Sequence, residues 1–241
     1  MEKLIFYNSI PSTNAEARRL AEEGAPHGTA VLAAAQTAGR GRMGRSFLSP
    51  EGGLYLSVIL RPEKPAAELM HLTAMLAVGA CNAVEAVCGV RPKVKWVNDL
   101  ILGGKKVAGI LVEPKLGADG RMEYAICGIG INCNTDLQSL TPEVREIATA
   151  LQAELGQPAD ISALAAAVVR QWTDLDENWL EIYRRDCVTL RKTVRVLGAE
   201  AYTAQAVDVT EDGALLVQTE AGTLRKVFTG EVSVRGLGGY V

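Results

Sequence analysis

Three arginines alternate with glycines in the segment AGRGRMGR, residues 38–45, and no acidic residue follows before Glu51. Arg40, Arg42 and Arg45 carry forked N–H donors that suit phosphate and carboxylate groups, and glycines let backbone amides approach a ligand closely. The segment therefore predicts a loop that binds an anion and is mobile without one. A solvated basic loop explains the same letters equally well. The net charge of −3 favours a small phosphate-bearing ligand over a nucleic-acid backbone.

A second group of polar residues lies in KWVNDLILGGKKVAGILVE, residues 95–113. Lys95, Asn98 and Asp99 end one predicted strand, and Lys106 opens the next after a turn at two glycines. A hairpin would bring Lys106 beside Asn98 and Asp99. A cation, an amide and a carboxylate in one corner suit a phosphate together with its magnesium. Residues that flank and cap an exposed turn account for the same pattern.

Two shorter motifs are ambiguous by themselves. GIGIN, residues 128–132, lacks the third glycine of a dinucleotide fingerprint and precedes no obvious helix, which disfavours a Rossmann site. Its glycines suit either a flat ligand lying on the strand or a tightly packed strand crossing. Ser12, Thr13 and Asn14 indicate a helix N-terminus, whose free amides and short polar side chains also suit a polar heterocycle.

The composition limits the chemistry and the compartment. The two histidines, His27 and His71, have no neighbours at ligand spacing, which disfavours a zinc site and a Ser-His-Asp hydrolase. The five cysteines form no CxxC pair and no long apolar run follows the N-terminus, so we expect a cytoplasmic protein without a signal peptide or spanning helix. A chain of 241 residues, 48% of them hydrophobic, predicts a globular main domain with a small appendage.

The periodicity of apolar residues places these motifs on an α+β framework. The predicted helices are an N-terminal one with Thr13 and Glu16 as a capping box and Gly24 as its stop, a long core helix over 65–88, and two helices over about 142–154 and 162–185. The predicted strands cover about 28–37, 54–60, 93–99, 106–113 and 123–134, the second of them half-buried. From Thr193 onward, short alternating segments between glycines predict a small β-barrel. We therefore expect two domains, residues 1–189 and 190–241.

Seven motifs occur in an order that resembles the biotin protein ligases: STN, QTAGRGRMGR, GGLYLSVIL, KWVND, KVAGILVE, GIGIN and GEVSVRG, spanning residues 12–236. Each motif is weak alone, but seven in matching order favour the functional interpretations above. The resemblance implies a mixed β-sheet with helices, like the catalytic domain of class II aminoacyl-tRNA synthetases and of biotin and lipoate ligases. A Src-homology-3-like small β-barrel is implied at the C-terminal end.

The resemblance also implies the activity. Biotin and ATP give biotinyl-5′-AMP and pyrophosphate, and the adenylate then acylates a lysine of a biotin carboxyl carrier protein, of acetyl-CoA carboxylase or another biotin-dependent carboxylase. Attack of a carboxylate on the α-phosphate needs charge neutralisation and alignment rather than a histidine base. The scarcity of histidines agrees with this chemistry.

The resemblance assigns roles to the residues that match the family motifs. The implied catalytic residues are Lys106, Arg40 and Arg42, with Lys106 bridging the biotin carboxylate and the α-phosphate. Biotin binding is implied for Ser12, Thr13, Asn14, Gln36, Gly39, Arg40, Gly41, Arg42, Lys106, Gly109, Gly128 and Gly130. ATP or adenylate binding is implied for Arg42, Arg45, Phe47, Lys95, Asn98, Asp99, Lys106, Asn132 and Arg235, with Mg²⁺ on Asp99.

Three positions depart from the family pattern. Phe47 stands where tryptophan is common and keeps an aromatic cover without the indole donor, Val97 replaces a common proline, and Met43 replaces a further arginine. Longer members begin with a DNA-binding domain, whereas the ligase motifs here start at residue 12, so we expect neither DNA binding nor repression. No membrane partner is expected, and a homodimer is compatible with the sequence.

Two other functions are open alternatives. Lipoate ligases and octanoyl transferases share a related catalytic architecture, but the arginine-rich loop and residues 12–14 favour a urea-containing ring. A nucleic-acid-binding protein would use the loop and the terminal barrel. The pI of about 5.6 speaks against that alternative.

Overall fold

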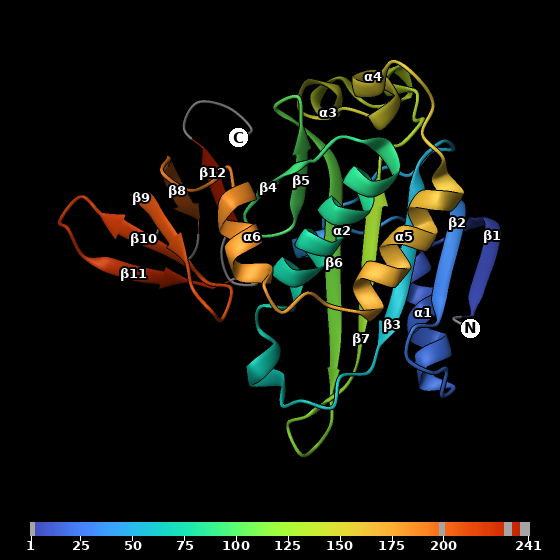
Figure 1. The fold of residues 1–241 in the computed structure, drawn as a ribbon, viewed down its shortest axis with the longest axis horizontal. Helices are drawn as coiled ribbons and strands as arrows, with labels where there is room; N and C mark the ends of the chain where they lie inside the picture. Colours follow the sequence, from blue (N-terminus) through green and yellow to red (C-terminus); the bar gives the residue numbers. More distant parts are fainter. Residues whose placement is uncertain (1–2, 198–200, 229–232, 237–241) are drawn as a thin grey trace.

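The computed structural model describes residues 3–197, 201–228 and 233–236, the last range as backbone only, and contains two β-sheets (Figure 1). The larger sheet has the strand order β1-β2-β3-β7-β6-β5-β4. Its strands are β1 (Leu4–Ile10), β2 (Ala30–Gln36), β3 (Leu54–Leu60), β4 (Lys93–Lys95), β5 (Asp99–Leu102), β6 (Lys105–Leu116) and β7 (Met122–Ile131). β1 and β2 are parallel and all the other pairs are antiparallel, so the sheet is mixed, as predicted.

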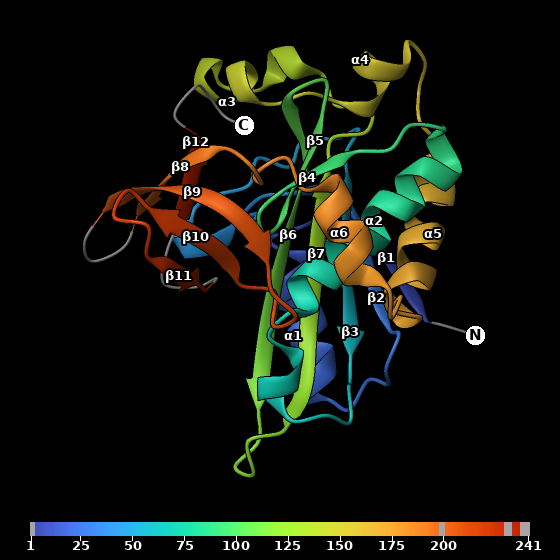
Figure 2. The ribbon, with the colours of Figure 1, turned by 60° about the vertical axis from the view of Figure 1, so that its left-hand side comes forward.

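Helices cover both faces of this sheet. They are α1 (Thr13–Glu22), α2 (Leu72–Cys88), α3 (Pro142–Ile147), α4 (Leu151–Leu155), α5 (Ile161–Thr173) and α6 (Trp179–Asp186), with short 3₁₀ turns η1 (Arg42–Gly44), η2 (Ala66–Leu69) and η3 (Leu137–Ser139). α1 packs on one face, and α2 and α5 pack side by side on the other (Figures 1 and 2).

Burial from both sides corrects one prediction. Leu56 and Val58 of β3 belong to the core with α2 and α5, whereas Ile59 clusters with Ala17 and Ala21 of α1. All seven residues of β3 are buried, so the prediction of a half-buried strand was wrong. The sheet is thus the middle of three layers.

The core helix predicted over 65–88 is confirmed over residues 72–88, as α2, and the 3₁₀ turn η2 precedes it. In the described residues, the segment 66–88 is long and apolar enough to cross a membrane by length and composition. Leu76, Ala80 and Val84 on it are fully buried, because α2 packs against α5, α6 and the sheet. Its apolar character is therefore that of a core helix of this fold.

The smaller sheet is antiparallel, with the order β11-β10-β9-β8-β12. Its strands are β8 (Thr193–Leu197), β9 (Tyr202–Val209), β10 (Leu215–Thr219), β11 (Leu224–Val227) and β12 (Ser233–Gly236). This agrees with the predicted small barrel-like domain. The β9–β10 turn packs against the start of α2 so closely that a Cβ on Gly213 would lie 2.9 Å from His71 Cα.

Helix α1 is capped one residue earlier than predicted. Ser12 is the N-cap, and its Oγ accepts from the amide of Ala15 at 3.4 Å. Thr13 is already helical, and its amide and hydroxyl both donate to Gln36 Oε1, at 2.8 and 3.1 Å. The predicted capping box of Thr13 and Glu16 is therefore wrong, because Thr13 is used in a tertiary contact.

Three predicted elements are interrupted. Residues 148–150 break the helix expected over 142–154 because they extend beside the start of β6, where the Thr149 amide donates to Lys106 O at 2.8 Å. The helix expected over 162–185 is divided into α5 and α6. The turn between them, residues 174–178, lets α6 pack against α2, β4 and β9. The strand expected over 93–99 is split, since residues 96–98 form a link between β4 and β5.

Candidate active site

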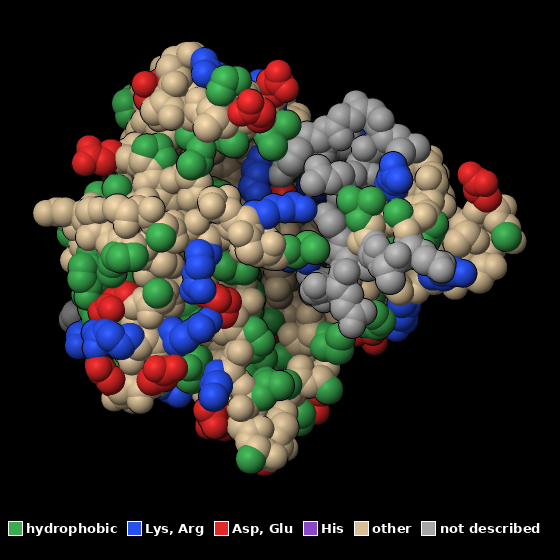
Figure 3. Space-filling model, turned by 180° about the vertical axis from the view of Figure 1, so that it is seen from behind, with side chains coloured by type: hydrophobic (Ala, Val, Ile, Leu, Met, Phe, Trp, Pro, Cys, Tyr) green, Lys and Arg blue, Asp and Glu red, His purple; other side chains and the backbone are tan. Residues whose placement is uncertain are grey.

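A cavity of about 420 Å³ lies on the α1 face of the large sheet, beyond the N-terminus of that helix. Figure 3 shows this side of the molecule, which is hollowed and has Lys and Arg side chains beside the hollow. The wall contains these predicted site residues: Ser12, Thr13, Asn14, Gln36, Arg40, Gly41, Arg42, Arg45, Phe47, Lys95, Asn98, Asp99, Lys106, Gly109, Gly128, Gly130 and Asn132. Residues that are far apart in the sequence therefore meet at one site.

Two predicted site residues are not on this wall. Gly39 lies behind it, where a Cβ would be 2.4 Å from Phe47 O and 2.5 Å from Ser49 Oγ, so the position admits only glycine. The backbone of Arg235 lies in β12, but its side chain is outside the described part of the chain. The binding role of Arg235 stays a prediction.

A polar network occupies one end of the cavity, where α1 starts and β2 ends. Gln36 Oε1 accepts from Thr13, and Gln36 Nε2 donates to Ser49 Oγ at 2.9 Å. Ser57 of β3 is fully buried, donates to Asn14 Oδ1 at 2.6 Å and lies 2.8 Å from Thr13 Oγ1. These contacts fix the amide planes of Asn14 and Gln36. Sequence reasoning missed Ser57, whose signal was a lone hydroxyl in the apolar strand LYLSVIL.

Glu113 of β6 is a second residue that sequence reasoning missed. Its Oε2 accepts from Asn14 Nδ2 at 2.7 Å and from Arg40 Nη2 at 3.1 Å, and its Oε1 accepts from Arg18 at 2.8 Å. The carboxylate thus joins α1, β6 and the arginine loop. Its alternation with Gly109 along β6 was the available signal, because residues two apart share a sheet face.

Gly128 and Gly130 form a floor at which side chains have no room. A Cβ on Gly128 would lie 2.0 Å from Asn14 Oδ1, and one on Gly130 would lie 2.4 Å from the Phe47 ring. Both glycines are on the cavity wall, and the close packing expected as one explanation of GIGIN is present; a flat ligand lying on this strand stays a prediction. The glycines let Asn14 and Phe47 lie directly on the strand.

The arginine loop, residues 38–45, lies over the cavity. Its backbone closes through a hydrogen bond from Gly41 N–H to Arg45 O at 2.7 Å, and Met43 has a left-handed φ of 56°. Arg40 reaches Glu113, as described above. Arg45 also lines the cavity. Mobility of this loop in the absence of ligand stays a prediction.

Within the described part of the chain, Arg42 is the arginine of the loop with a buried, unpartnered N–H donor. Its Nη1 donates to Asn98 Oδ1 at 3.0 Å, while its Nη2 is buried and has no partner among the described atoms. Burial lowers the pKa of Arg42, and the Asp99 carboxylate nearby opposes that shift. A buried N–H donor without an acceptor is costly, so this donor is open to an acceptor on a ligand, and the anion-binding role of Arg42 stays a prediction.

Lys106 and Asp99 form the predicted corner on the adjacent strands β6 and β5. Lys106 Nζ lies 2.6 Å from Asp99 Oδ1 and 5.9 Å from the centre of the Phe47 ring. A Cβ on Gly109 would lie 3.0 Å from Lys106 Nζ, so the glycine leaves room for the ammonium group. Lys95, also on the wall, is largely buried. The hairpin prediction for this corner is confirmed by the β5–β6 pairing.

The other end of the cavity is apolar. Its wall includes Leu140, Val144, Ile147 and Ala148. Val144 and Ile147 are three residues apart on α3 and share one helix face, and Ala148 follows where the helix ends. Asn132 Nδ2 donates to Thr149 O at 2.9 Å and holds this segment near β7. Sequence reasoning predicted a helix here but did not assign its apolar face to the site.

The described residues contain no group of three or more His, Cys, Asp or Glu side chains that could hold a metal ion. Of the described wall residues, Asp99 is the one with a carboxylate, and it is paired with Lys106. Mg²⁺ keeps several waters and binds through one or two carboxylates plus phosphate oxygens at nucleotide sites. The residues present therefore fit an ion that arrives with a phosphate ligand, not a resident metal.

Comparisons with known proteins agree along the chain. Residues 6–132 match the biotin/lipoate A/B protein ligase family, and residues 189–235 match the biotin protein ligase C terminal domain. The chain is 33% identical over 246 residues to the bifunctional ligase/repressor BirA of Bacillus spizizenii, which covers 97% of this chain and 74% of that protein. It is 36% identical over 173 residues to a biotin ligase for acetyl-CoA carboxylase from Paracoccus denitrificans, covering 68% and 71% of the two chains. The biotin protein ligase from Aquifex aeolicus, solved with biotin and ATP, superposes with a TM-score of 0.82 at 31% identity, covering 98% of this chain and 100% of that one.

Proposed function

We propose, on the premise that this chain belongs to the biotin/lipoate A/B protein ligase family, that its cavity holds biotin at the polar end and ATP toward the apolar end. The protein is a biotin protein ligase, which activates biotin with ATP and transfers it to a biotin carboxyl carrier protein. The observation that supports this assignment is that one cavity wall holds the hydrogen-bonded network of Thr13 and Gln36, the Lys106–Asp99 ion pair and the apolar side chains of α3.

The polar end suits the ureido ring of biotin. The ring has one carbonyl acceptor and two N–H donors in a plane. Asn14 and Gln36 each have one amide N–H that the described network does not use, and the Thr13 and Ser12 oxygens lie beside them. Because Ser57 and Glu113 fix the orientation of Asn14, these groups are preorganised for a urea.

The first step is a displacement at phosphorus. A carboxylate oxygen of biotin attacks the α-phosphorus, the bond to the bridging oxygen breaks, and pyrophosphate leaves. Lys106 donates N–H bonds to the carboxylate and the α-phosphate, and Arg42 donates its unused Nη2 to phosphate as charge moves between them. In the second step the neutral amine of the carrier lysine attacks the acyl carbon and AMP leaves.

ATP is proposed to place its base against the apolar wall of Val144 and Ile147 and its phosphates near Arg42, Arg45 and Lys95. Mg²⁺ would enter with the phosphates and be held beside Asp99, where it supplies charge neutralisation. Chelation with EDTA is expected to stop pyrophosphate release. Release that is unchanged by EDTA would contradict a role for the ion.

Biotin-dependent pyrophosphate release tests the assignment. The wild-type protein with ATP and Mg²⁺ should release pyrophosphate on addition of biotin and label a carrier domain in a second step. Addition of lipoate in place of biotin should give release at the background rate. Folded protein without biotin-dependent release would contradict the proposal, and an equal response to lipoate would reassign the substrate to the related acyl acids.

Substitution Gly128→Ala tests the floor of the biotin site. The new methyl group would displace Asn14, whose amide Ser57 and Glu113 hold in place. Overpacking of this kind costs about 1–3 kcal/mol, so the KM for biotin should rise about tenfold or more with little change in the KM for ATP. Gly117→Ala is the matched control, because its Cβ would meet only the side chains of Asp119 and Glu123. Equal biotin KM values in the two variants would show that the floor is misassigned.

The remaining assignments concern partners and location. A homodimer is supported by the free edge of the sheet at β1, where Leu4 and Phe6 are more than half exposed, and sedimentation tests it. A cytoplasmic location is supported by five free cysteines. No DNA partner is proposed, in keeping with the net charge of −3, and a DNA titration at low salt should be flat.

A further inference from the structure

Residues 96–98, the link between β4 and β5, occupy a central place in the nucleotide half of the site. Lys95 and Asp99, on either side of the link, form the last pair of the β4–β5 ladder. Trp96 and Asn98 within it line the cavity, and Asn98 is the acceptor for Arg42. The position of this link therefore sets the position of the residues that surround it.

Two side chains and one turn from the C-terminal part of the chain form hydrogen bonds with the link. Thr189 Oγ1 accepts from the amide of Trp96 at 2.9 Å, and the Tyr183 hydroxyl donates to Val97 O at 3.2 Å. The indole N–H of Trp96 donates to Gly213 O, in the β9–β10 turn, at 3.1 Å. All three hydrogen bonds are buried, where a lost partner cannot be replaced by water.

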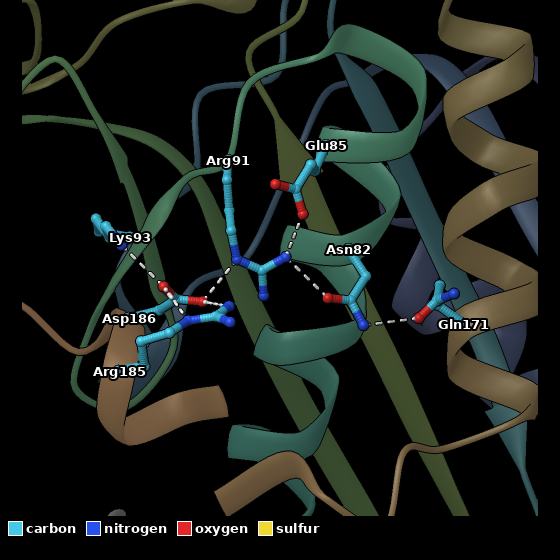
Figure 4. Close-up of polar contacts among 7 residues, drawn as sticks. All are labelled: Asn82, Glu85, Arg91, Lys93, Gln171, Arg185 and Asp186. Atoms are coloured by element: carbon cyan, nitrogen blue, oxygen red, sulfur yellow. Dashed lines mark hydrogen bonds and ion pairs between the residues drawn. The ribbon is translucent and has the colours of Figure 1, made fainter. Parts of the chain in front are cut away.

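The helix that carries Tyr183 is itself fastened to the catalytic sheet. Asp186, three residues further along α6, accepts hydrogen bonds from Arg91 and Lys93 at 2.7 and 2.8 Å (Figure 4). Lys93 is the first residue of β4 and Arg91 lies just before it, so these bonds fasten α6 to the start of β4. The amide of Val188 donates to Val94 O at 2.9 Å. Tyr183 and Thr189 thus lie on a segment that is hydrogen-bonded to β4. Their hydroxyl groups are therefore fixed relative to β4 and can fix the position of the link.

We propose that Thr189 and Tyr183 are positioning residues that set the nucleotide half of the site through the Trp96–Val97 backbone. They act through Asn98, and Asn98 acts on Arg42; neither Thr189 nor Tyr183 lines the cavity. This inference rests on the proposed placement of ATP in that half. The biotin half is outside their reach, because Thr13, Asn14 and Gln36 are held by Ser57, Ser49 and Glu113 on other elements.

The pair Thr189→Val and Thr189→Ser tests the inference. Valine keeps the shape of threonine and removes the acceptor for Trp96 N–H, whereas serine keeps the acceptor. Thr189→Val should raise the KM for ATP in pyrophosphate release about tenfold, the effect of leaving one buried polar group unpaired, with the KM for biotin unchanged within twofold. Thr189→Ser should stay within twofold of the wild type for both substrates.

Tyr183→Phe provides a second measurement with its own control. It removes one hydroxyl group and should also raise the KM for ATP selectively. Tyr124→Phe makes the same change at another core tyrosine, whose partly buried hydroxyl bonds to Glu22, and should leave the KM for ATP unchanged. A loss of folded enzyme lowers the rate but changes neither the KM for ATP nor the KM for biotin. A merely structural role therefore predicts no selective rise in the KM for ATP.

The outcomes separate this inference from the proposed function. Wild-type protein that releases pyrophosphate with biotin while Thr189→Val and Tyr183→Phe keep the wild-type KM for ATP would overturn the inference alone. Equal changes in the KM for ATP and for biotin, or a serine variant that behaves like the valine variant, would also overturn it. Wild-type protein without biotin-dependent release would overturn the proposed function first.

Discussion

Lys106→Ala is expected to lower the rate of biotin-dependent pyrophosphate release at least ~10²-fold, the scale of removing one preorganised charge stabiliser. In the proposed mechanism, negative charge builds between the biotin carboxylate and the α-phosphate as the new bond forms, and the ammonium group of Lys106 on the cavity wall neutralises it. Asp99, 2.6 Å away, and the room left by Gly109 fix that group before the substrates arrive. An alanine leaves the Asp99 carboxylate uncompensated where the anions must meet.

The neighbouring lysine supplies a matched control. Lys105 is exposed, and its Nζ reaches only the carbonyl of Arg145 at 3.5 Å, so Lys105→Ala should change the rate less than twofold. The two variants make the same change in net charge one residue apart. Quenched-flow or coupled measurement of pyrophosphate with saturating ATP and biotin distinguishes them. A Lys106→Ala rate within tenfold of the wild type would mean that another cation, such as Arg42, neutralises the transition state.

The motif residues could be predicted because their residue types and their spacing within short segments indicate their chemistry. Forked donors on a glycine-rich segment suit an anion site as well as a solvated loop, and the structure places Arg40, Arg42 and Arg45 on one cavity. The hairpin at two glycines brings Lys106 to Asp99 by local rules alone. The terminal small sheet also follows from the short alternating segments between glycines, whereas the mixed sheet was implied by the resemblance to the biotin protein ligases.

Residues that act through long-range contacts could not be predicted in the same way. Ser57 looks like a polar interruption of a strand until α1 packs over it, and Glu113 has no visible partner until Asn14 and Arg40 arrive from other elements. The helix cap failed for the same reason: Thr13 satisfies a local capping rule, but Gln36, 23 residues away, takes its hydroxyl. Tertiary hydrogen bonds override local preference at each of these positions.

The interrupted helix and strand also could not be predicted, because long-range contacts override the local sequence pattern. The helical pattern over 142–154 is continuous in sequence, yet residues 148–150 gain backbone hydrogen bonds to β6 and to Asn132 by leaving the helix. Residues 96–98 leave the β4–β5 ladder and take hydroxyl partners from Tyr183 and Thr189 instead. Both breaks lie at the cavity, where the site needs backbone that regular elements do not provide.

Asp186→Asn is expected to lower the free energy of unfolding by about 3 kcal/mol at neutral pH, the low end of the cost of breaking a buried ion pair. The Asp186 carboxylate is almost fully buried and accepts from Arg91, Lys93 and Arg185, and the same network continues to Asn82, Glu85 and Gln171 (Figure 4). We expect the low end of this range because Arg91 keeps its ion pair with Glu85 in the variant. Urea unfolding measures the change, and Asp208→Asn is the control, since its pair with Arg184 is exposed and worth less than about 1 kcal/mol.

The pH dependence of unfolding provides the sharper form of this prediction. Burial acts to raise the pKa of Asp186, but hydrogen bonds from Arg185, Lys93 and Arg91 outweigh it and hold the pKa well below its ordinary value of 3.8. A carboxyl group whose pKa is lower in the folded state contributes stability above its ordinary pKa and loses it as the pH falls toward the folded value. The difference in unfolding free energy between the wild type and Asp186→Asn should therefore be constant from pH 7 to pH 5 and shrink progressively below pH 4. A difference that stays constant down to pH 3 would mean that lost packing, and not the lost charge, destabilises the variant.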